Sequence, residues 1–152
     1  MIGNAPPVKL PSPCPNLCQN MRLSLHTVFI ALALSIIALP AQAVDVNGYR
    51  RANGLKPLNA NATLTSLAKA HATDMARRQS MDHANFFEVR AKRGAAGENV
   101  TYGCPDMGCA VQMWINSGPH RANMLRPDFT RYGLGSAVSA SGQRYWALVL
   151  GR

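Results

Sequence analysis

The end of the chain constrains the fold most, because it predicts a strand that is apolar on both faces. Residues 144–150 are aromatic, β-branched or otherwise apolar after Arg144, and Ala140–Gln143 separates them from a second candidate strand, Tyr132–Ser139. Alternate side chains of a strand point to opposite sides of the sheet. One face would carry Tyr145, Ala147 and Val149, and the other Trp146, Leu148 and Leu150. We therefore expect a β-hairpin that is covered by helices on both sides.

Helical patterns come before this hairpin. The longest predicted helix, Ala62–Gln79, has Asn61 as a candidate N-cap and an apolar stripe with helical spacing. His71 lies on that stripe, and we interpret it as a buried core residue rather than a ligand. Shorter helices are expected over Val44–Ala52, Asn85–Arg93, Gly108–Asn116 and Ser117–Leu125. We expect Leu55–Leu58 to be extended and Gly94–Gly97 to be a flexible break.

The beginning of the chain predicts export. Residues 21–27 form a short basic start, Val28–Leu39 is an apolar run, and Ala41–Ala43 has the small-x-small pattern of a cleavage site. An uncleaved membrane anchor is the alternative, but the run is shorter than the ~20 residues that cross a bilayer. We expect a signal peptide over 21–43, a secreted or periplasmic protein and a mature domain over 44–152.

Residues 1–20 fit neither the signal peptide nor the domain. They hold two of the four cysteines and show no periodicity. Either Met21 is the true start and this leader is an artefact of start-site choice, or a long leader is removed together with the signal. In both cases Cys14 and Cys18 would be absent from the mature domain.

Cys104 and Cys109 are then the cysteines of the mature domain. An even number in an exported chain predicts a disulfide, which would close the short loop Pro105–Gly108 and stabilise the domain by roughly 2 kcal/mol. The alternative is a pair of thiolate metal ligands. This spacing matches a C-x-x-C knuckle poorly, so we favour the disulfide.

The charge of the chain limits its partners. Lys and Arg number 16 and Asp and Glu 7, which gives a formal net charge of +9. The basic residues are scattered and are not interleaved with aromatic ones, so we expect no nucleic-acid binding. Anionic surfaces such as lipid headgroups are candidate partners, although solubility alone explains the charge. After signal cleavage we expect a monomer without stable membrane insertion.

Three polar residues are candidates for a site. His83 begins a loop after the longest helix, Glu98 follows the glycine-rich break, and His120 lies near the start of a short helix that Ser117 would cap and in which Pro119 is tolerated. Two imidazoles and a carboxylate are the minimum set for a divalent metal or a polar catalytic pocket.

The mature domain as a whole resembles the CAP superfamily, which includes cysteine-rich secretory proteins, antigen 5 and pathogenesis-related protein 1. The order and combination of its motifs carry the resemblance. They are Asn47–Arg50, Gly54–Leu58, Leu67-Ala68, His71-Ala72, Met75-Ala76, His83, Gly97–Asn99, Trp114, Ser117–Leu125, Tyr132–Gly135 and Tyr145-Trp146. The resemblance implies an α+β domain built as a three-layer α-β-α sandwich.

The resemblance also implies a central cleft. Many members carry two His and two Glu there, and by motif His83, Glu98 and His120 correspond to three of them. The second Glu usually lies three residues after the helix Trp, where this chain has Ser117. In addition, Gly118-Pro119 stands where bacterial members commonly have Pro-Gly. The set expected to line the cleft is therefore His83, Glu98, Ser117 and His120, with one carboxylate missing.

Two classes of function follow from this resemblance. The first is a non-enzymatic exported domain that binds an apolar or lipid-like ligand or an extracellular partner, with or without a metal. The second is a peptidase-like hydrolase in which His83 and His120 hold a divalent ion such as zinc and Glu98 is the general base. A purely structural hydrogen-bonded network of the same side chains is a third interpretation.

Export can be tested directly. The mature chain should begin at Val44, because cleavage is expected after the Ala41–Ala43 site. N-terminal sequencing of exported material is the measurement. Recovery of the full-length chain from the cytoplasm would contradict the prediction.

Overall fold

The computed structural model describes residues 44–152, the range predicted to be the mature domain. The leader expected over 1–20 and the signal peptide expected over 21–43 lie outside the described residues. Within the described part, no helix combines the length and the apolar character needed to cross a membrane.

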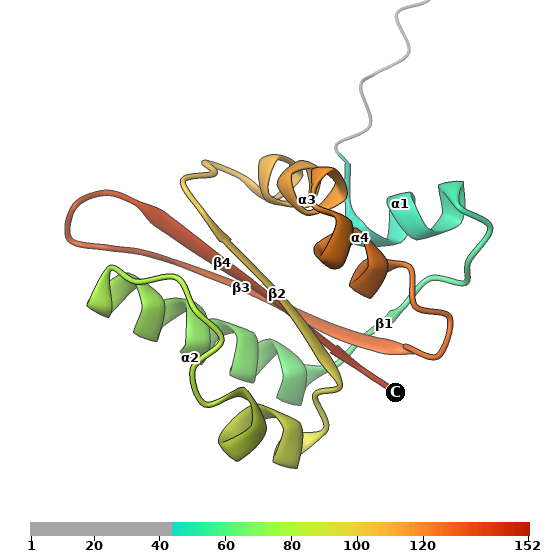
Figure 1. Cartoon of the computed structure of the whole chain (residues 1–152), viewed down its shortest axis with the longest axis horizontal. Helices are drawn as coiled ribbons and strands as arrows, with labels where there is room; N and C mark the ends of the chain where they lie inside the picture. Colours follow the sequence, from blue (N-terminus) through green and yellow to red (C-terminus); the bar gives the residue numbers. More distant parts are fainter. Residues whose placement is uncertain (1–43) are drawn as a thin grey trace, which may run out of the picture. The chain divides into compact units, whose positions relative to one another are not determined.

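A four-stranded sheet forms the middle layer of this domain (Figure 1). Its strands are β1 (Asn59–Ala60), β2 (Gly97–Tyr102), β3 (Arg131–Val138) and β4 (Arg144–Gly151), in the order β1-β3-β4-β2. The predicted hairpin is β3 and β4, which pair antiparallel, and β2 also pairs antiparallel with β4. The short strand β1 runs parallel to the beginning of β3.

Strand β2 corrects one prediction. We expected a flexible break over Gly94–Gly97 that separates Glu98 from the preceding short helix, but Gly97 already pairs with Leu150, and Glu98 pairs with Val149. The pairing begins just before the strand, where Ala96 N donates to Leu150 O at 2.7 Å. The pairing partner is far away in sequence, so local glycine content gave the wrong signal.

Helices cover both faces of the sheet. The helices are α1 (Val46–Ala52), α2 (Ala62–Arg78), α3 (Met107–Asn116) and α4 (Gly118–Met124). Figure 1 shows α2 on one face and α1, α3 and α4 on the other, which confirms the expected three-layer α-β-α sandwich. A π-helix, Phe86–Arg90, and a 3₁₀ turn, Ala91–Arg93, stand where one short helix was predicted.

Capping explains where the helices begin. Asn61 caps α2 as predicted, since its side chain accepts a hydrogen bond from Leu64 N at 3.0 Å. Asp106 caps α3 by accepting from Cys109 N at 2.9 Å, so this helix starts slightly earlier than expected. Ser117 occupies the N-cap position of α4 but makes no side-chain capping bond there.

The predicted double-faced strand divides the core into two parts. One face of β4 packs with α1, α3 and α4 around Trp114, and the other packs with α2 around Met75. On the first face lie Trp146, Leu148 and Leu150, and on the second Tyr145, Ala147 and Val149, as predicted. Burying both faces removes apolar side chains from water, which is the main favourable contribution to folding.

Helix α2 lies directly on the backbone of β3. A Cβ added to Gly133 would overlap the backbone of Leu64 and Thr65, and one added to Gly135 would come within 2.6 Å of the carbonyl carbon of Ala68. These glycines are therefore required for the close approach of a helix rather than for a turn. The approach brings α2, and His71 with it, next to the sheet.

A buried arginine ties α1 to the end of α4. Arg50 is 2% exposed, and its guanidinium has no carboxylate partner within residues 44–152. It donates instead to the carbonyl oxygens of Met124 at 2.7 Å, Arg126 at 2.9 Å and Lys56 at 3.0 Å. Burial lowers the pKa of Arg50, and these carbonyl groups compensate part of its charge.

The predicted disulfide is present. Cys104 and Cys109 are bridged with their Cα atoms 5.4 Å apart, and the bond connects the end of β2 to the first turn of α3. The Trp146 Nε1–H group donates to Cys104 O at 2.9 Å, which fixes the same loop to the sheet. The two thiols are therefore not the metal ligands considered as the alternative.

Replacing Gly133 with alanine should destabilise the protein by about 3 kcal/mol or more, because the added methyl group overlaps the α2 backbone. The matched control is Gly118→Ala, where an added Cβ meets nothing within 4 Å. This control should change stability by less than about 1 kcal/mol. Urea denaturation measures both, and equal midpoints for the two variants would contradict the close packing.

Candidate functional site

A buried carboxylate on the edge strand β2 is the centre of the candidate site. Glu98 is 6% exposed, and three other segments reach it. Arg90, at the end of the π-helix, donates from Nη2 to Glu98 Oε1 at 2.9 Å, and its Nε contacts Oε2. Arg90 Nε and Glu98 Oε2 have no other partner within the described chain, so the ion pair is bidentate. Arg90 also lies over the Phe86 ring, 5.6 Å from its centroid.

His83 forms the exposed side of the site. Its Nδ1 lies 2.9 Å from Glu98 Oε1, while its side chain is 52% exposed. A carboxylate that is paired with arginine is ionised and can only accept, so His83 carries its proton on Nδ1. In the neutral ring the second nitrogen is then an acceptor, and in the protonated ring it becomes a donor.

His71 reaches the same carboxylate from α2. It is buried, as predicted, and its Nε2 donates to Asp82 O at 2.8 Å. The same nitrogen lies 3.6 Å from Glu98 Oε1. It also lies 3.5 Å from Arg90 Nη2, but two donors cannot bond to each other, so that contact is only a close approach. His71 is thus both a core residue and a neighbour of the site.

Two asparagines hold α4, which carries His120, against β2. Asn99 is fully buried and donates from its side chain to His120 O at 2.8 Å. Asn123 donates to Asn99 Oδ1 at 3.0 Å and to Glu98 O at 3.2 Å. The end of α4 is also held by Arg50, so His120 is positioned by buried polar contacts at both ends of its helix.

The electrostatics distinguish the three imidazoles. The hydrogen bond to Glu98 raises the pKa of His83, whereas burial lowers the pKa of His71. Burial also lowers the pKa of His120, and the charge of His83 lowers it further. The folded state is therefore stabilised by protonated His83 below its ordinary pKa of about 6.5, and this contribution is lost as the pH rises through the raised value. The lowered pKa values of His71 and His120 have the opposite effect on stability. Below about pH 6.5 these imidazoles bind protons more readily in the unfolded chain than in the folded one, so acid destabilises the folded state.

The side chains fit a catalytic metal centre poorly. No group of three or more His, Cys, Asp and Glu that could hold a metal ion occurs in the described part of the chain. Glu98 is neutralised by Arg90, which leaves two imidazoles, His83 and His120, as candidate ligands. Catalytic zinc sites normally have three protein ligands. Ser117, expected to line the cleft, is half-buried at the start of α4.

A hollow lies behind the site, between α2 and the π-helix. It has a volume of about 210 Å³, and His71 and Arg90 belong to its lining together with Ala84, Asn85 and Val89. Phe86 N donates to His83 O at 3.2 Å, so the π-helix that bounds the hollow is tied to the loop that carries His83.

The roles of several residues in this site could not be identified from the sequence. Arg90 was not recognised, because a lone arginine among Phe, Val and Lys has no local pattern that indicates burial. Phe87 and Val89, which lie within the short helix predicted over Asn85–Arg93, are 76% and 44% exposed. Asn99 and Asn123 were missed as structural residues, although Asn99 lies in the Gly-Glu-Asn motif that located Glu98.

Residues 45–150 match the sequence profile of the CAP, or cysteine-rich secretory protein, family. The uncharacterized protein YkwD of Bacillus subtilis (strain 168) is 34% identical over 117 residues, which cover 70% of this chain and 46% of that protein. The uncharacterized membrane protein YlbC of the same organism is 31% identical over 62% of this chain and 30% of its own length. The chain therefore spans less than half the length of these relatives.

Two solved structures have a similar fold. An extracellular protein containing an SCP domain from Bacillus anthracis str. Ames is 28% identical, with a TM-score of 0.59 over 70% of this chain and 37% of that chain. An outer surface protein from Borrelia burgdorferi has a TM-score of 0.60 and 17% identity over 70% of this chain and 86% of that chain. The low identity of the second limits that similarity to the fold.

The imidazoles should titrate in a defined order. His83 should titrate above the ordinary histidine pKa, and His120 and His71 below it, because of the Glu98 bond and of burial respectively. Glu98→Gln should lower the pKa of His83, since the amide cannot favour the imidazolium as a carboxylate does. His83→Gln should raise the pKa of His120 by removing a neighbouring charge. NMR titration of the ring protons measures each value, and an unchanged His83 pKa in Glu98→Gln would contradict the assignment.

Proposed function

Since this chain belongs to the cysteine-rich secretory protein, or CAP, family, we propose that its mature domain is an exported, non-enzymatic binding module for an amphiphilic ligand. The ligand would have an apolar body and an anionic head. One observation carries the proposal: His83 is half exposed and bonded to a carboxylate that Arg90 already neutralises, and it lies between Met81 and Phe87, two exposed apolar residues of the same segment.

The neutralised carboxylate argues for binding rather than hydrolysis. A general base must be free to accept a proton, but Glu98 already accepts from Arg90 and His83 in a buried position. The alternative hydrolase would also need a third metal ligand. Ser117 stands at the position where many family members have the second carboxylate, so that ligand is missing here. The same network does suit a binding site, because it holds His83 in one orientation at the surface.

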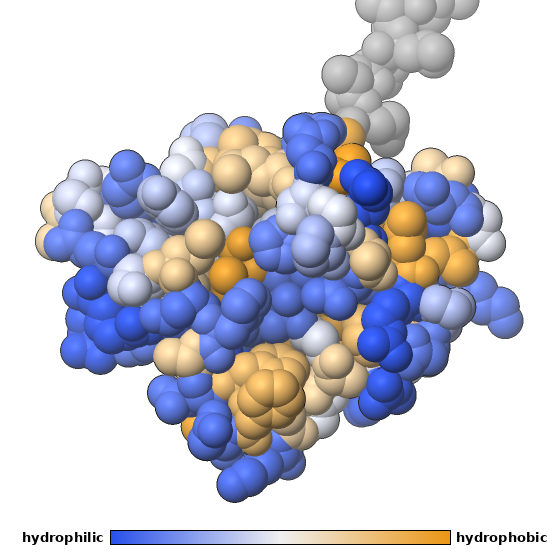
Figure 2. Space-filling view, in the orientation of Figure 1, coloured by the Kyte–Doolittle hydropathy of each residue, from blue (hydrophilic) through white to orange (hydrophobic). Residues whose placement is uncertain are grey.

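The apolar contribution comes from the π-helix and the loop before it. Phe87 is 76% exposed, and Met81 and Val89 are each 44% exposed. Figure 2 shows apolar surface over this segment, in the lower part of the view. Exposed apolar residues that gather next to a polar group are typical of ligand-binding surfaces. A lipid-like chain could contact these side chains while its head approaches His83.

The charge of the domain favours an anionic head. Residues 44–152 hold 14 Lys and Arg against 7 Asp and Glu, which is a formal net charge of +7, and Lys92 and Arg93 are exposed just after the π-helix. The raised pKa of His83 adds positive charge as the pH falls. An anionic amphiphile therefore meets favourable charge at the site and on its surroundings.

The family and the predicted signal peptide both support a proposal of export. The relative from Bacillus anthracis is described as extracellular and that from Borrelia burgdorferi as an outer surface protein. We propose that this chain is likewise secreted or periplasmic, with the domain over 44–152 as its mature part.

A metal is not required by this function. Zinc held by only His83 and His120 would bind weakly and would be released as acid protonates the imidazoles.

The test is a titration with dansyl-undecanoic acid, a fluorescent anionic amphiphile. Phe87→Ser should weaken its binding by about tenfold, because burial of a large apolar side chain contributes about 1.5 kcal/mol or more. The matched control, Val138→Ser, replaces a residue that is 52% exposed on β3 rather than on the π-helix, and it should bind like wild type. The wild-type affinity should fall as the pH rises through the His83 pKa, and His83→Gln should remove that dependence.

The same titration is repeated with added zinc and with a chelator, alongside a peptide-cleavage assay. Equal affinity in both conditions is expected for metal-free binding. Equal binding by Phe87→Ser and Val138→Ser would overturn the proposed surface. Zinc-dependent peptide cleavage that His83→Ala and His120→Ala abolish would instead establish the hydrolase.

A further inference from the structure

The outer edge of β3 is open over most of its length. Strand β1 pairs only with Arg131 and Tyr132, after which Asn61 begins α2 and the chain leaves the sheet. Of the strands formed by residues 44–152, none pairs with Gly133–Val138 on this side. Figure 1 shows the arrangement: β1 lies beside the right-hand end of β3, and the hairpin continues to the left without it.

The register identifies which backbone groups face outward. Asn61 N donates to Tyr132 O at 2.9 Å, so Tyr132 directs its carbonyl group to the outer side. At the other end, Ser139 N donates to Gln143 O at 2.8 Å, toward β4. Because antiparallel strands alternate between bonded and outward-facing residues, the amides of Leu134, Ser136 and Val138 face outward. Each of these residues is half-buried or exposed, whereas Gly133 and Gly135 are buried.

Hollows flank this edge on both faces of the sheet. On the α2 side, a hollow of about 540 Å³ includes Ala60, Ser66 and Lys69 in its lining. On the other side, one of about 320 Å³ lies between α1 and β3 and includes Arg51 and Leu134. Successive side chains of an added strand would point alternately to these two sides.

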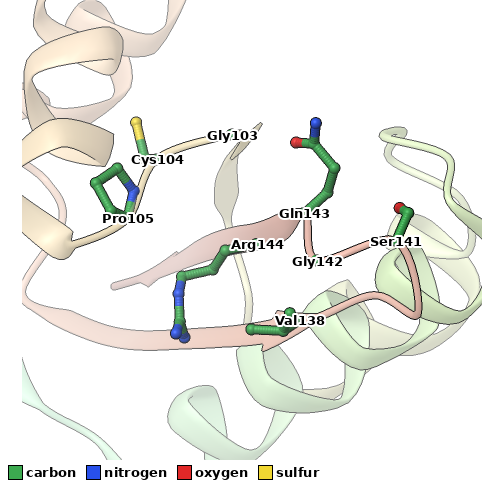
Figure 3. Close-up of a pocket in the computed structure, with 8 residues that line it drawn as sticks. All are labelled: Gly103, Cys104, Pro105, Val138, Ser141, Gly142, Gln143 and Arg144. Atoms are coloured by element: carbon green, nitrogen blue, oxygen red, sulfur yellow. The ribbon is translucent and has the colours of Figure 1, made fainter.

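A third hollow, of about 480 Å³, lies at the hairpin end of the edge (Figure 3). It is bounded by the loop that carries Cys104 and Pro105 and by the hairpin residues from Val138 to Arg144. Figure 3 shows the Val138 and Arg144 side chains on adjacent strands at this end, and the two residues are cross-strand partners. The Arg144 guanidinium donates to Ser136 Oγ at 3.3 Å and lies 5.9 Å from the centre of the Trp146 ring.

Each of the three hollows carries one basic side chain. These are Lys69, Arg51 and Arg144, and none of them takes part in an ion pair with another residue of the described domain. The acidic residue in these linings is Asp45, whose carboxylate is already bonded to Gly48 N at 2.6 Å. The edge is therefore positively charged along its length. A second copy of this chain would bring like charges together, whereas an acidic strand would be attracted.

We propose that the open edge of β3 binds an extended acidic peptide segment of another protein by β-strand addition. Backbone hydrogen bonds to Leu134, Ser136 and Val138 would supply affinity, and the flanking hollows and basic side chains would select the sequence. This site lies on β3, one strand beyond β4 from the His83–Glu98 site on β2. It is independent of the proposed amphiphile binding.

Amide hydrogen exchange in the free protein gives the first test. The amides of Leu134, Ser136 and Val138 should exchange quickly, whereas those of Gly135 and Ala137, which face β4, should be protected. The probe is the peptide Ac-EVEVTVEV-NH2, and its addition should protect the three outward amides. Protection of these amides without peptide, or no change when it is added, would overturn the proposal.

The second test compares Ser136→Pro with Ser136→Ala. Both variants lose the Ser136 hydroxyl, but only proline removes the outward N–H, and proline is tolerated at an edge where that group does not pair within the sheet. Ser136→Pro should bind the peptide about threefold to tenfold more weakly than Ser136→Ala, as expected for one lost backbone hydrogen bond. Equal affinities for the two variants would contradict strand addition.

Charge variants test the edge without altering its backbone. Lys69→Glu and Arg144→Gln should each weaken peptide binding severalfold, and more so at low salt. The matched control is Arg93→Gln, an exposed cation on the 3₁₀ turn before β2, which should have no effect. The lysine analogue Ac-KVKVTVKV-NH2 should bind more weakly than the acidic peptide. Tighter binding of the lysine analogue, or a protein dimer that the Ser136→Pro variant dissociates, would overturn the acidic partner.

Discussion

The close approach of α2 to β3 is the constraint on which the rest of the domain depends. Gly133 and Gly135 leave no side chain between the helix and the strand, so the backbone of α2 lies directly on the sheet. The buried residues of α2 that face the sheet include Ala68 and Ala72, which are both fully buried. Because these side chains are small, the helix and the sheet lie close together along the contact. This distance carries His71 to the neighbourhood of Glu98, since a more distant helix could not bring a buried imidazole within 3.6 Å of that carboxylate.

The buried Arg90–Glu98 pair decides the character of the site. Burying two charges is costly and stabilises a fold little, but removing one partner leaves an unpaired charge and costs about 3–5 kcal/mol. The pair therefore acts mainly as a constraint on geometry: it orders the π-helix, fixes one end of β2 and orients His83. The same pairing occupies both carboxylate oxygens of Glu98, and this is the reason that we propose binding rather than hydrolysis.

The two edges of the sheet, at β2 and at β3, have separate roles in these proposals. Strand β2 is held to α4 by the Asn99 and Asn123 contacts and carries Glu98, the carboxylate that His83 and His71 approach. The β3 edge is open beyond Tyr132, because β1 is short and turns into α2 at the Asn61 cap. An edge with exposed backbone donors is a hazard for aggregation unless it is short, charged or covered. The basic residues along β3 supply that protection and at the same time select an acidic partner.

The sequence by itself determined the layered architecture. The double-faced pattern of β4 required helices on both sides, the Asn61 cap and the apolar stripe set the beginning and face of α2, and the cysteine count in an exported chain predicted the disulfide. These features are encoded by neighbouring residues or by the spacing of apolar side chains along the sequence, and neither depends on long-range contacts. The motifs around His83, Glu98 and His120 also located candidate residues, because residue types at fixed positions can be recognised without geometry.

Only the tertiary structure decided what those residues contact. Strand β2 exists because β4 pairs with it from about fifty positions away along the chain, and local glycines concealed it. Arg90 is buried because the π-helix turns it onto Glu98, while Phe87 and Val89 are left at the surface. Burial, charge neutralisation and an unpaired edge are properties of long-range contacts, and no local pattern of side chains encodes them.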